Sequence, residues 1–169
     1  MECKLRRTRD EDVIRVMEII KQAQEYFKAR NIDQWQNGYP EKEVIKADIQ
    51  SGWSYVWKEK DKIVATAAIS FDGEPTYDEI YNGEWLSSGE YAVIHRICVD
   101  NEYKGLGLAS QILDSAESLC VDRNVHSIKI DTHRENISMQ KSLIKNGYKY
   151  CGIIYLEDKS ERVAFEKIF

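Results

Sequence analysis

Hydrophobic and polar residues follow one another along this chain in two rhythms, one typical of strands and one typical of helices. Short alternating or apolar runs predict seven strands, over residues 4–8, 53–58, 63–71, 91–99, 126–132, 148–156 and 162–168. Apolar residues spaced three or four apart predict four helices, over residues 11–29, 41–50, 108–119 and 136–146. The predicted order of elements is therefore β-α-α-β-β-β-α-β-α-β-β, without repeats or linkers.

Residues that favour caps and turns stand between these elements. Asp10 is the predicted N-cap of the first helix. Gly38 and Pro40 separate the first two helices. Lys60 and Asp61 join two strands into a predicted hairpin.

The connection over residues 72–90 has an unusual composition. It holds several acids, no lysine or arginine, and the interleaved aromatic residues Tyr77, Tyr81 and Trp85. A run of like charge is typical of a solvated surface segment, but an acidic and aromatic segment also suits a cationic amine. The sequence leaves both interpretations open.

The segment from Ile94 to Leu119 predicts an anion site. A buried strand is followed by a loop that contains Gly105 and Gly107 and then by an amphipathic helix. Because the first N–H groups of a helix lack internal partners and the helix dipole adds positive charge there, a phosphate can bind without a dedicated cation. The two glycines leave no Cβ in the way of close approach.

Spacing separates three kinds of phosphate-binding loop. A Walker loop requires lysine after its second glycine, and none follows Gly107. A dinucleotide-binding loop requires a third glycine where this chain has Ser110, although Asp131 stands at the distance expected for a ribose contact. The acyl-coenzyme A loop, Arg/Gln-x-x-Gly-x-Gly/Ala, matches Lys104-Gly-Leu-Gly-Leu-Ala109 with lysine in place of Arg or Gln.

A second block follows at a typical separation. The strand segment Ile128–His133 leads to Asn136, a helix, and Gly147-Tyr148 at the start of another strand. Together the two blocks resemble the GNAT family of N-acetyltransferases, and the resemblance covers nearly the whole chain. It implies an α/β (α+β) fold in a single domain over residues 1–169, with a mixed, mostly antiparallel sheet of about seven strands, splayed near its middle and flanked by four helices.

The resemblance also implies where the co-substrate acetyl-coenzyme A binds. Backbone amides of the strand before the loop bind the pantetheine arm, the loop amides bind the diphosphate, and the asparagine that caps the next helix also contacts the coenzyme. Ser110 can add a hydroxyl donor. The expected binding residues are Ile97, Cys98, Val99, Lys104, Gly105, Leu106, Gly107, Leu108, Ala109, Ser110 and Asn136.

The implied reaction is direct transfer of an acetyl group to a primary amine of a small molecule or peptide, without a metal. His95 is the first candidate for the general base because histidine exchanges protons near neutral pH, although a histidine within a strand is also common as a structural residue. Glu90 and Tyr91 stand near the position where some family members carry a catalytic glutamate. Leu143 occupies the position of the tyrosine that often protonates the leaving thiolate, so no general acid is assigned.

The acceptor site is less defined. Trp35 and Tyr39 lie in the loop between the first two helices, which borders the acceptor groove in the family, and either line that groove or pack beneath the loop. His133, close to Asn136, either contacts substrate or makes a backbone hydrogen bond. Arg162 is expected to pair with a neighbouring glutamate at the surface rather than with a substrate carboxylate.

The composition restricts the classes of binding partner that we expect. The chain has a formal net charge of −5 and a pI near 5.3, which weigh against binding to nucleic acid or an anionic membrane. Its four cysteines are scattered, without a Cys-x-x-Cys pair, which argues against a zinc site and a disulfide scaffold. The absence of a long apolar run and of a signal-like N-terminus favours the cytoplasm. A homodimer remains open.

Two other functions compete with catalysis by acetyl transfer. A coenzyme-binding sensor or regulator would keep the loop and dispense with the acid that Leu143 replaces. A nucleotide-binding protein would use Gly105, Gly107 and Asp131, and would prefer NAD to coenzyme A.

Overall fold

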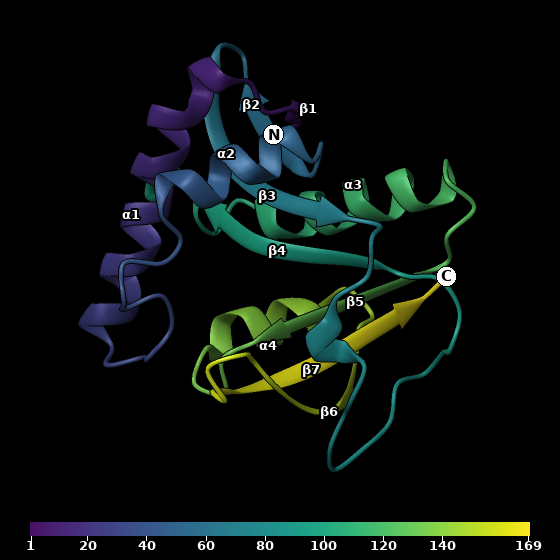
Figure 1. The fold of residues 1–169 in the computed structure, drawn as a ribbon. Coiled ribbons are helices and arrows are strands. Elements are labelled where there is room, and N and C mark those ends of the chain that lie inside the picture. The colour runs from purple at the N-terminus through teal and green to yellow at the C-terminus, as the bar shows by residue number, and fades with distance from the viewer. The chain divides into compact units, whose positions relative to one another are not determined.

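The computed structural model describes all residues from Met1 to Phe169 and confirms the predicted order of elements (Figure 1). The strands are β1 Lys4–Arg7, β2 Ser54–Glu59, β3 Lys62–Ser70, β4 Ala92–Val99, β5 Ser127–Thr132, β6 Lys149–Tyr155 and β7 Glu161–Ile168. The helices are α1 Val13–Ala29, α2 Lys42–Gln50, α3 Leu108–Val121 and α4 Ile137–Lys145, with short 3₁₀ helices η1 Asp10–Asp12, η2 Pro75–Tyr77 and η3 Asn101–Tyr103. Among these helices, none combines the length and the apolar character needed to cross a bilayer.

The seven strands form one mixed sheet in the order β1-β2-β3-β4-β5-β7-β6. The pairs β1–β2, β2–β3, β5–β7 and β6–β7 are antiparallel, so the expectation of a mostly antiparallel sheet is confirmed. The strands β4 and β5 are parallel, and their register pairs Ala92 with Ile128 and Val93 with Lys129.

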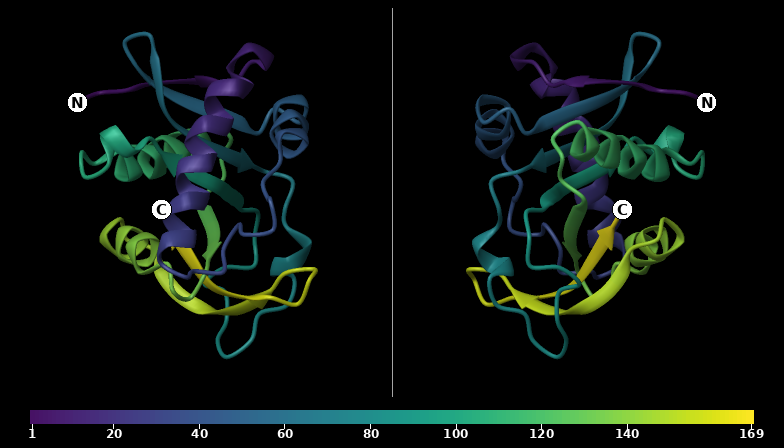
Figure 2. Two further views of the ribbon diagram at one scale, coloured as in Figure 1. Left: turned by 90° about the vertical axis from the view of Figure 1, so that its left-hand side faces the viewer. Right: turned by 90° about the vertical axis from the view of Figure 1, so that its right-hand side faces the viewer.

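The chain divides into two compact units, which are described separately. The first comprises Met1–Ile69 and His95–Ser115. In this unit, α2 and the first turns of α3 lie on opposite faces of β2 and β3 (Figure 2). Its core is built from the apolar stripe of α1 and from inward residues of the strands: Val13, Val16, Ile19, Ile20, Ile45, Val56, Ile63 and Cys98.

The second unit comprises Ser70–Ile94 and Ala116–Phe169. Here α4 and the connection that contains η2 lie on opposite faces of β5 and β7 (Figure 2). Tyr77 of η2 is only 2% exposed and packs with Val93, Ile154 and Ala164 in the core of this unit. The connection therefore covers the sheet, which differs from a solvated surface segment.

Two expectations about single residues are wrong. Asp10 does not cap the first helix; instead, the Asp12 carboxylate accepts a hydrogen bond of 2.7 Å from the Arg9 N–H, at the N-cap of η1. Arg162 is not in a surface ion pair, because its side chain is buried and donates to the backbone carbonyl of Glu161 at 2.8 Å.

Candidate functional site

The loop after β4 begins at a fixed point in the first unit. The Asp100 carboxylate accepts from the Glu102 N–H at 2.9 Å and pairs with the Arg15 guanidinium of α1. The Asp100 N–H donates to the carbonyl of Val64 in β3 at 2.9 Å. Burial by itself would raise the pKa of Asp100, but the hydrogen bonds from Glu102 and Arg15 hold that pKa below its usual value. The carboxylate stays charged and ties the loop to α1, while the Asp100 N–H ties it to β3.

Beyond this point the backbone opens towards solvent. Gly105 and Gly107 have φ of +78° and +81°, values that favour glycine, and a Cβ built on either one would meet nothing within 4 Å. The N–H groups of residues 105–110 have no hydrogen-bond acceptor within the protein, and the first helical bond here runs from the Gln111 N–H to the Gly107 carbonyl. A set of unpaired amides at the start of a fourteen-residue helix suits an anion.

Two cations flank one aromatic ring beside this loop. The Lys104 ammonium lies 4.5 Å from the centroid of the Tyr26 ring, and the Arg30 guanidinium carbon lies 3.8 Å from the same centroid. Burial and then the charge of Arg30 lower the pKa of Lys104. Two cationic side chains therefore lie beside the loop, although the chain as a whole carries net negative charge.

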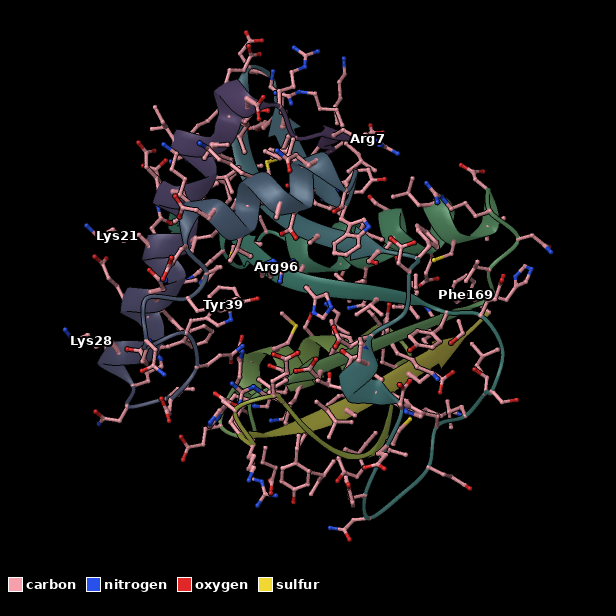
Figure 3. All side chains as sticks on the ribbon, in the orientation of Figure 1. Arg7, Lys21, Lys28, Tyr39, Arg96 and Phe169 are labelled. Carbon is pink, nitrogen blue, oxygen red and sulfur yellow. The ribbon has the colours of Figure 1, made fainter.

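A second cluster in the first unit lies further back along β4. Arg96 has a φ of +55°, which is uncommon for a residue with a side chain. Its guanidinium donates to the buried Asp48 carboxylate of α2 at 2.8 and 2.6 Å and to the Tyr39 hydroxyl at 2.7 Å, and Figure 3 labels Arg96 and Tyr39 as neighbours. These hydrogen bonds hold β4 in its irregular conformation.

His95 lies beside this cluster. Burial raises the pKa of Asp48, while the charges of Arg96 and His95 act in the opposite direction, so His95 is close enough to interact with that carboxylate. The side chain of His95 is half-buried. A polar, partly accessible environment suits proton exchange, which leaves His95 as a candidate base.

The two aromatic residues expected at the acceptor differ in their surroundings. Trp35 is half-buried, packs against the core of the first unit and meets the ring of Phe27 edge-on at 5.7 Å. Tyr39 is 41% exposed and carries the hydroxyl that accepts from Arg96. Tyr39 is thus the one of the two that offers a surface to a ligand.

The strand residues expected at the pantetheine arm alternate in exposure. Ile97 and Val99 are half-buried, whereas Cys98 points into the core. Burial raises the pKa of the Cys98 thiol to about 12, which keeps the thiol protonated at neutral pH. If Cys98 contributes to binding, it does so through its backbone.

Asn136 and His133 belong to the second unit. The Asn136 side chain accepts from the Met139 N–H at 3.2 Å, so its predicted role as the N-cap of α4 is confirmed. His133 Nδ1 accepts from the Glu135 N–H at 3.1 Å, which is the backbone hydrogen bond that the sequence left open.

The second unit contains a cavity of about 570 Å³ beneath the connection to β4. Tyr77, Trp85 and Tyr91 supply aromatic walls, and Lys129 of β5 reaches in from the sheet. The Tyr91 hydroxyl accepts from the Glu74 N–H at 3.3 Å, whereas Glu90 is exposed and does not line the cavity. Tyr91 thus helps to hold the connection in place and lines the cavity. The catalytic roles expected for Tyr91 and Glu90 remain proposals.

Three polar residues of these sites were missed at the level of sequence: Asp48, Arg96 and Lys129. Each stands in a helix or strand with an otherwise ordinary pattern, and each is buried or nearly so. For Lys129, the sequence shows only the alternation Ser127, Lys129, Asp131 along β5, which is typical of a strand surface that faces solvent and does not indicate a site. In the structure the connection covers this surface.

Comparison with known proteins gives consistent matches over most of the chain. Residues 18–148 match the family described as "Acetyltransferase (GNAT) family". A GNAT-family acetyltransferase from Streptococcus agalactiae 2603 is 33% identical, with a TM-score of 0.90, over 99% of this chain and 95% of that one. An uncharacterized N-acetyltransferase of Bacillus subtilis (strain 168), YesJ, is 22% identical over 93% of this chain and 85% of its own length. The PaiA N-acetyltransferase of Thermoplasma acidophilum, crystallised with coenzyme A, shares the fold at 17% identity and a TM-score of 0.72, with all of both chains covered.

Proposed function

Since this chain belongs to the GNAT family of acetyltransferases, we propose that it transfers an acetyl group from acetyl-coenzyme A directly to a primary amine of a small molecule or peptide. The observation that carries the proposal is the row of unpaired backbone N–H groups over residues 105–110, beside two glycines with open space where a Cβ would stand. This arrangement fits a diphosphate, because N–H groups at a helix start compensate negative charge.

Different groups of the chain bind different parts of the co-substrate. The amides of residues 105–110 hold the diphosphate, with the Ser110 hydroxyl as a further donor. The expected contribution of the Lys104 amide is wrong, because that N–H donates to the Asn101 carbonyl at 3.4 Å. Backbone groups of Ile97, Cys98 and Val99 hold the pantetheine arm, and Asn136 contacts the coenzyme as well as capping its helix. The Thermoplasma acidophilum neighbour, crystallised with coenzyme A, supports this assignment at the level of the fold.

His95 is the proposed general base. When bound, the co-substrate supplies the activated acetyl group, and the incoming amine must be neutral to attack it. His95 takes up the amine's proton, and Asp48 stabilises the positive charge that the imidazole then carries. Glu90 and Tyr91 are the alternatives for this role. Tyr39 and His133 are the proposed contacts of the acceptor, whereas Trp35 packs against the core of the first unit.

A catalytically inactive, coenzyme-binding regulator is the second candidate. Leu143 is fully buried in α4 and offers no proton to a leaving thiolate. A thiolate of coenzyme A leaves without strong acid assistance, so we favour the enzyme. A screen of polyamines, amino acids, aminoglycosides and peptide N-termini, with acetylated product measured by mass spectrometry, separates the two: binding of acetyl-coenzyme A without any product favours the regulator.

Replacing Gly107 tests the proposed diphosphate site. In Gly107→Ala the new Cβ enters the open space beside the loop amides, and we expect the Kd for acetyl-coenzyme A to rise at least about tenfold in calorimetric titration, equivalent to roughly 1.4 kcal/mol. Gly73→Ala is the matched control, because Gly73 has a similar φ of +77° and its Cβ would make only an ordinary contact of 3.8 Å.

Both variants should lose about 1 kcal/mol of stability from the left-handed backbone. An unchanged affinity in Gly107→Ala, or an equal loss of affinity in Gly73→Ala, would move the diphosphate away from this loop.

A further inference from the structure

The cavity of the second unit is built around a buried lysine. Lys129 is 4% exposed, and its ammonium lies 4.1 Å from the centroid of the Tyr91 ring and 4.6 Å from that of Trp85. The aromatic faces in this cavity therefore already hold a cation that belongs to the chain. A cationic amine, which the acidic and aromatic composition of residues 72–90 suggested, would have to displace it or share the cavity with it.

The hydrogen-bonding capacity of Lys129 is largely unused. An ammonium has three N–H donors. The one acceptor within reach is the Ser87 carbonyl at 3.5 Å, the outer limit for a hydrogen bond, and Lys129 has no carboxylate within ion-pair distance. A buried ammonium in this state gains from any acceptor that enters the cavity.

The neighbouring acids are engaged elsewhere or exposed. Glu166 is fully buried, and its carboxylate accepts from the Leu86 N–H at 2.6 Å and from the hydroxyls of Ser87 and Ser127. Asp131 accepts from the Tyr77 hydroxyl at 2.6 Å. Asp78 lines the cavity but is exposed to solvent. The field of Glu166 reaches Lys129 and opposes the lowering of its pKa by burial, yet no acid supplies Lys129 with a hydrogen bond.

We propose that this cavity binds a small aromatic carboxylate. The carboxylate accepts hydrogen bonds from the Lys129 ammonium, and the ring of the ligand lies against the aromatic walls that Tyr77, Trp85 and Tyr91 provide. A volume of about 570 Å³ falls within the usual range for small-molecule sites. The site is distinct from the proposed diphosphate loop in the chain and does not depend on acetyl transfer.

Three probes of the same size test the charge that the cavity selects. Benzoate, neutral benzamide and cationic benzylamine are titrated into the whole protein at pH 7, with binding followed by calorimetry and by saturation-transfer NMR. We expect benzoate to bind at least about tenfold more tightly than benzamide, since a hydrogen bond to a charged group contributes more than a neutral one. Benzylamine should bind most weakly. Equal affinity for benzoate and benzamide, preference for benzylamine, or no binding of benzoate would overturn the proposal.

A pair of variants locates the binding. Lys129→Met keeps an unbranched buried side chain and removes the charge, and we expect it to lose at least about ninety per cent of the affinity for benzoate. Lys141→Met, at an exposed position of α4, is the matched control and should bind as the native chain does. Unchanged binding in a folded Lys129→Met would place the ligand elsewhere. If Lys129→Met does not fold, the comparison of probes on the native chain decides.

Discussion

Asp12 carries the interactions that fix the start of α1. Its buried carboxylate accepts from the Arg6 guanidinium at 2.7 and 2.9 Å and from the Arg9 N–H at 2.7 Å. The hydrogen bonds from Arg6 and then that from Arg9 hold the pKa of Asp12 below its usual value, against the effect of burial. A carboxyl with a lowered pKa stabilises the folded chain above the pKa of its unfolded state, about 3.9, and this stabilisation is lost as the pH falls through the folded pKa.

Asp12→Asn should lower the free energy of unfolding by about 1–3 kcal/mol at pH 7, because it removes the charge that Arg6 and the Arg9 N–H bind. Asp10→Asn, which changes an exposed acid two residues earlier, should stay within about 0.5 kcal/mol of the native chain. Urea unfolding at pH 7 and again below pH 3 measures both. The difference between the native chain and Asp12→Asn should shrink at the lower pH; a loss that is the same at both pH values would contradict this account.

The sequence predicted that Asp10 caps this helix, whereas the acid bound at its start is Asp12, which accepts from Arg6 and from the preceding Arg9 N–H rather than from the helix. Asp10 and Asp12 both precede the first apolar stripe, and both are suitable cap residues by type. The choice between them depends on Arg6, whose side chain reaches Asp12 from β1. That contact is tertiary, so a local pattern does not contain it.

The connection between β3 and β4 is held to β6 by close backbone contact. Tyr81 and Ile153 exchange two backbone hydrogen bonds of 2.8 Å in an isolated antiparallel bridge. A Cβ built on Gly83 would stand 1.9 Å from the Cys151 carbonyl oxygen, so any side chain there forces the backbones apart. The contact positions the aromatic residues that wall the cavity.

Gly83→Ala should therefore lower the free energy of unfolding by about 1–3 kcal/mol, the usual cost of forcing extra volume into a packed site. Gly89→Ala, in the same connection, adds a Cβ that meets nothing within 4 Å and should change stability by less than about 0.5 kcal/mol. Chemical denaturation of the two variants side by side provides the measurement. Equal stability of Gly83→Ala and Gly89→Ala would show that the connection is not held against β6.

Helices and strands were predictable because periodicity is a local property of the sequence. The segments that pack over each strand face were not predictable, because they come from distant parts of the chain. The apolar stripe of α3 and the alternation of β2 and β3 are visible in single segments. The polar face of β5, with Ser127, Lys129 and Asp131, looks equally local and predicts exposure. Several of its partners, Tyr77, Ser87 and Tyr91, come from the connection between β3 and β4, so only the folded chain reveals that this face is buried.

At the scale of the whole molecule, two short blocks were enough to predict the fold. The glycine loop and the Asn136 block indicated the family and with it the order of strands and helices. The family match over residues 18–148 agrees with that prediction. The polar cluster around Arg96 was less predictable, because its side chains converge from separate elements. Tyr39, Asp48 and Arg96 come from a loop, a helix and a strand and meet only in the structure.

The central claim is that the N–H groups of residues 105–110 bind the diphosphate of the coenzyme. Backbone amide NMR of the native chain tests it, with coenzyme A as the ligand and pantetheine, which lacks the diphosphate, as the control. We predict that coenzyme A shifts the amide resonances of residues 105–110 and protects these N–H groups from exchange, and that pantetheine at matched occupancy does not. Saturation with coenzyme A that leaves these amides unshifted and unprotected would contradict the claim.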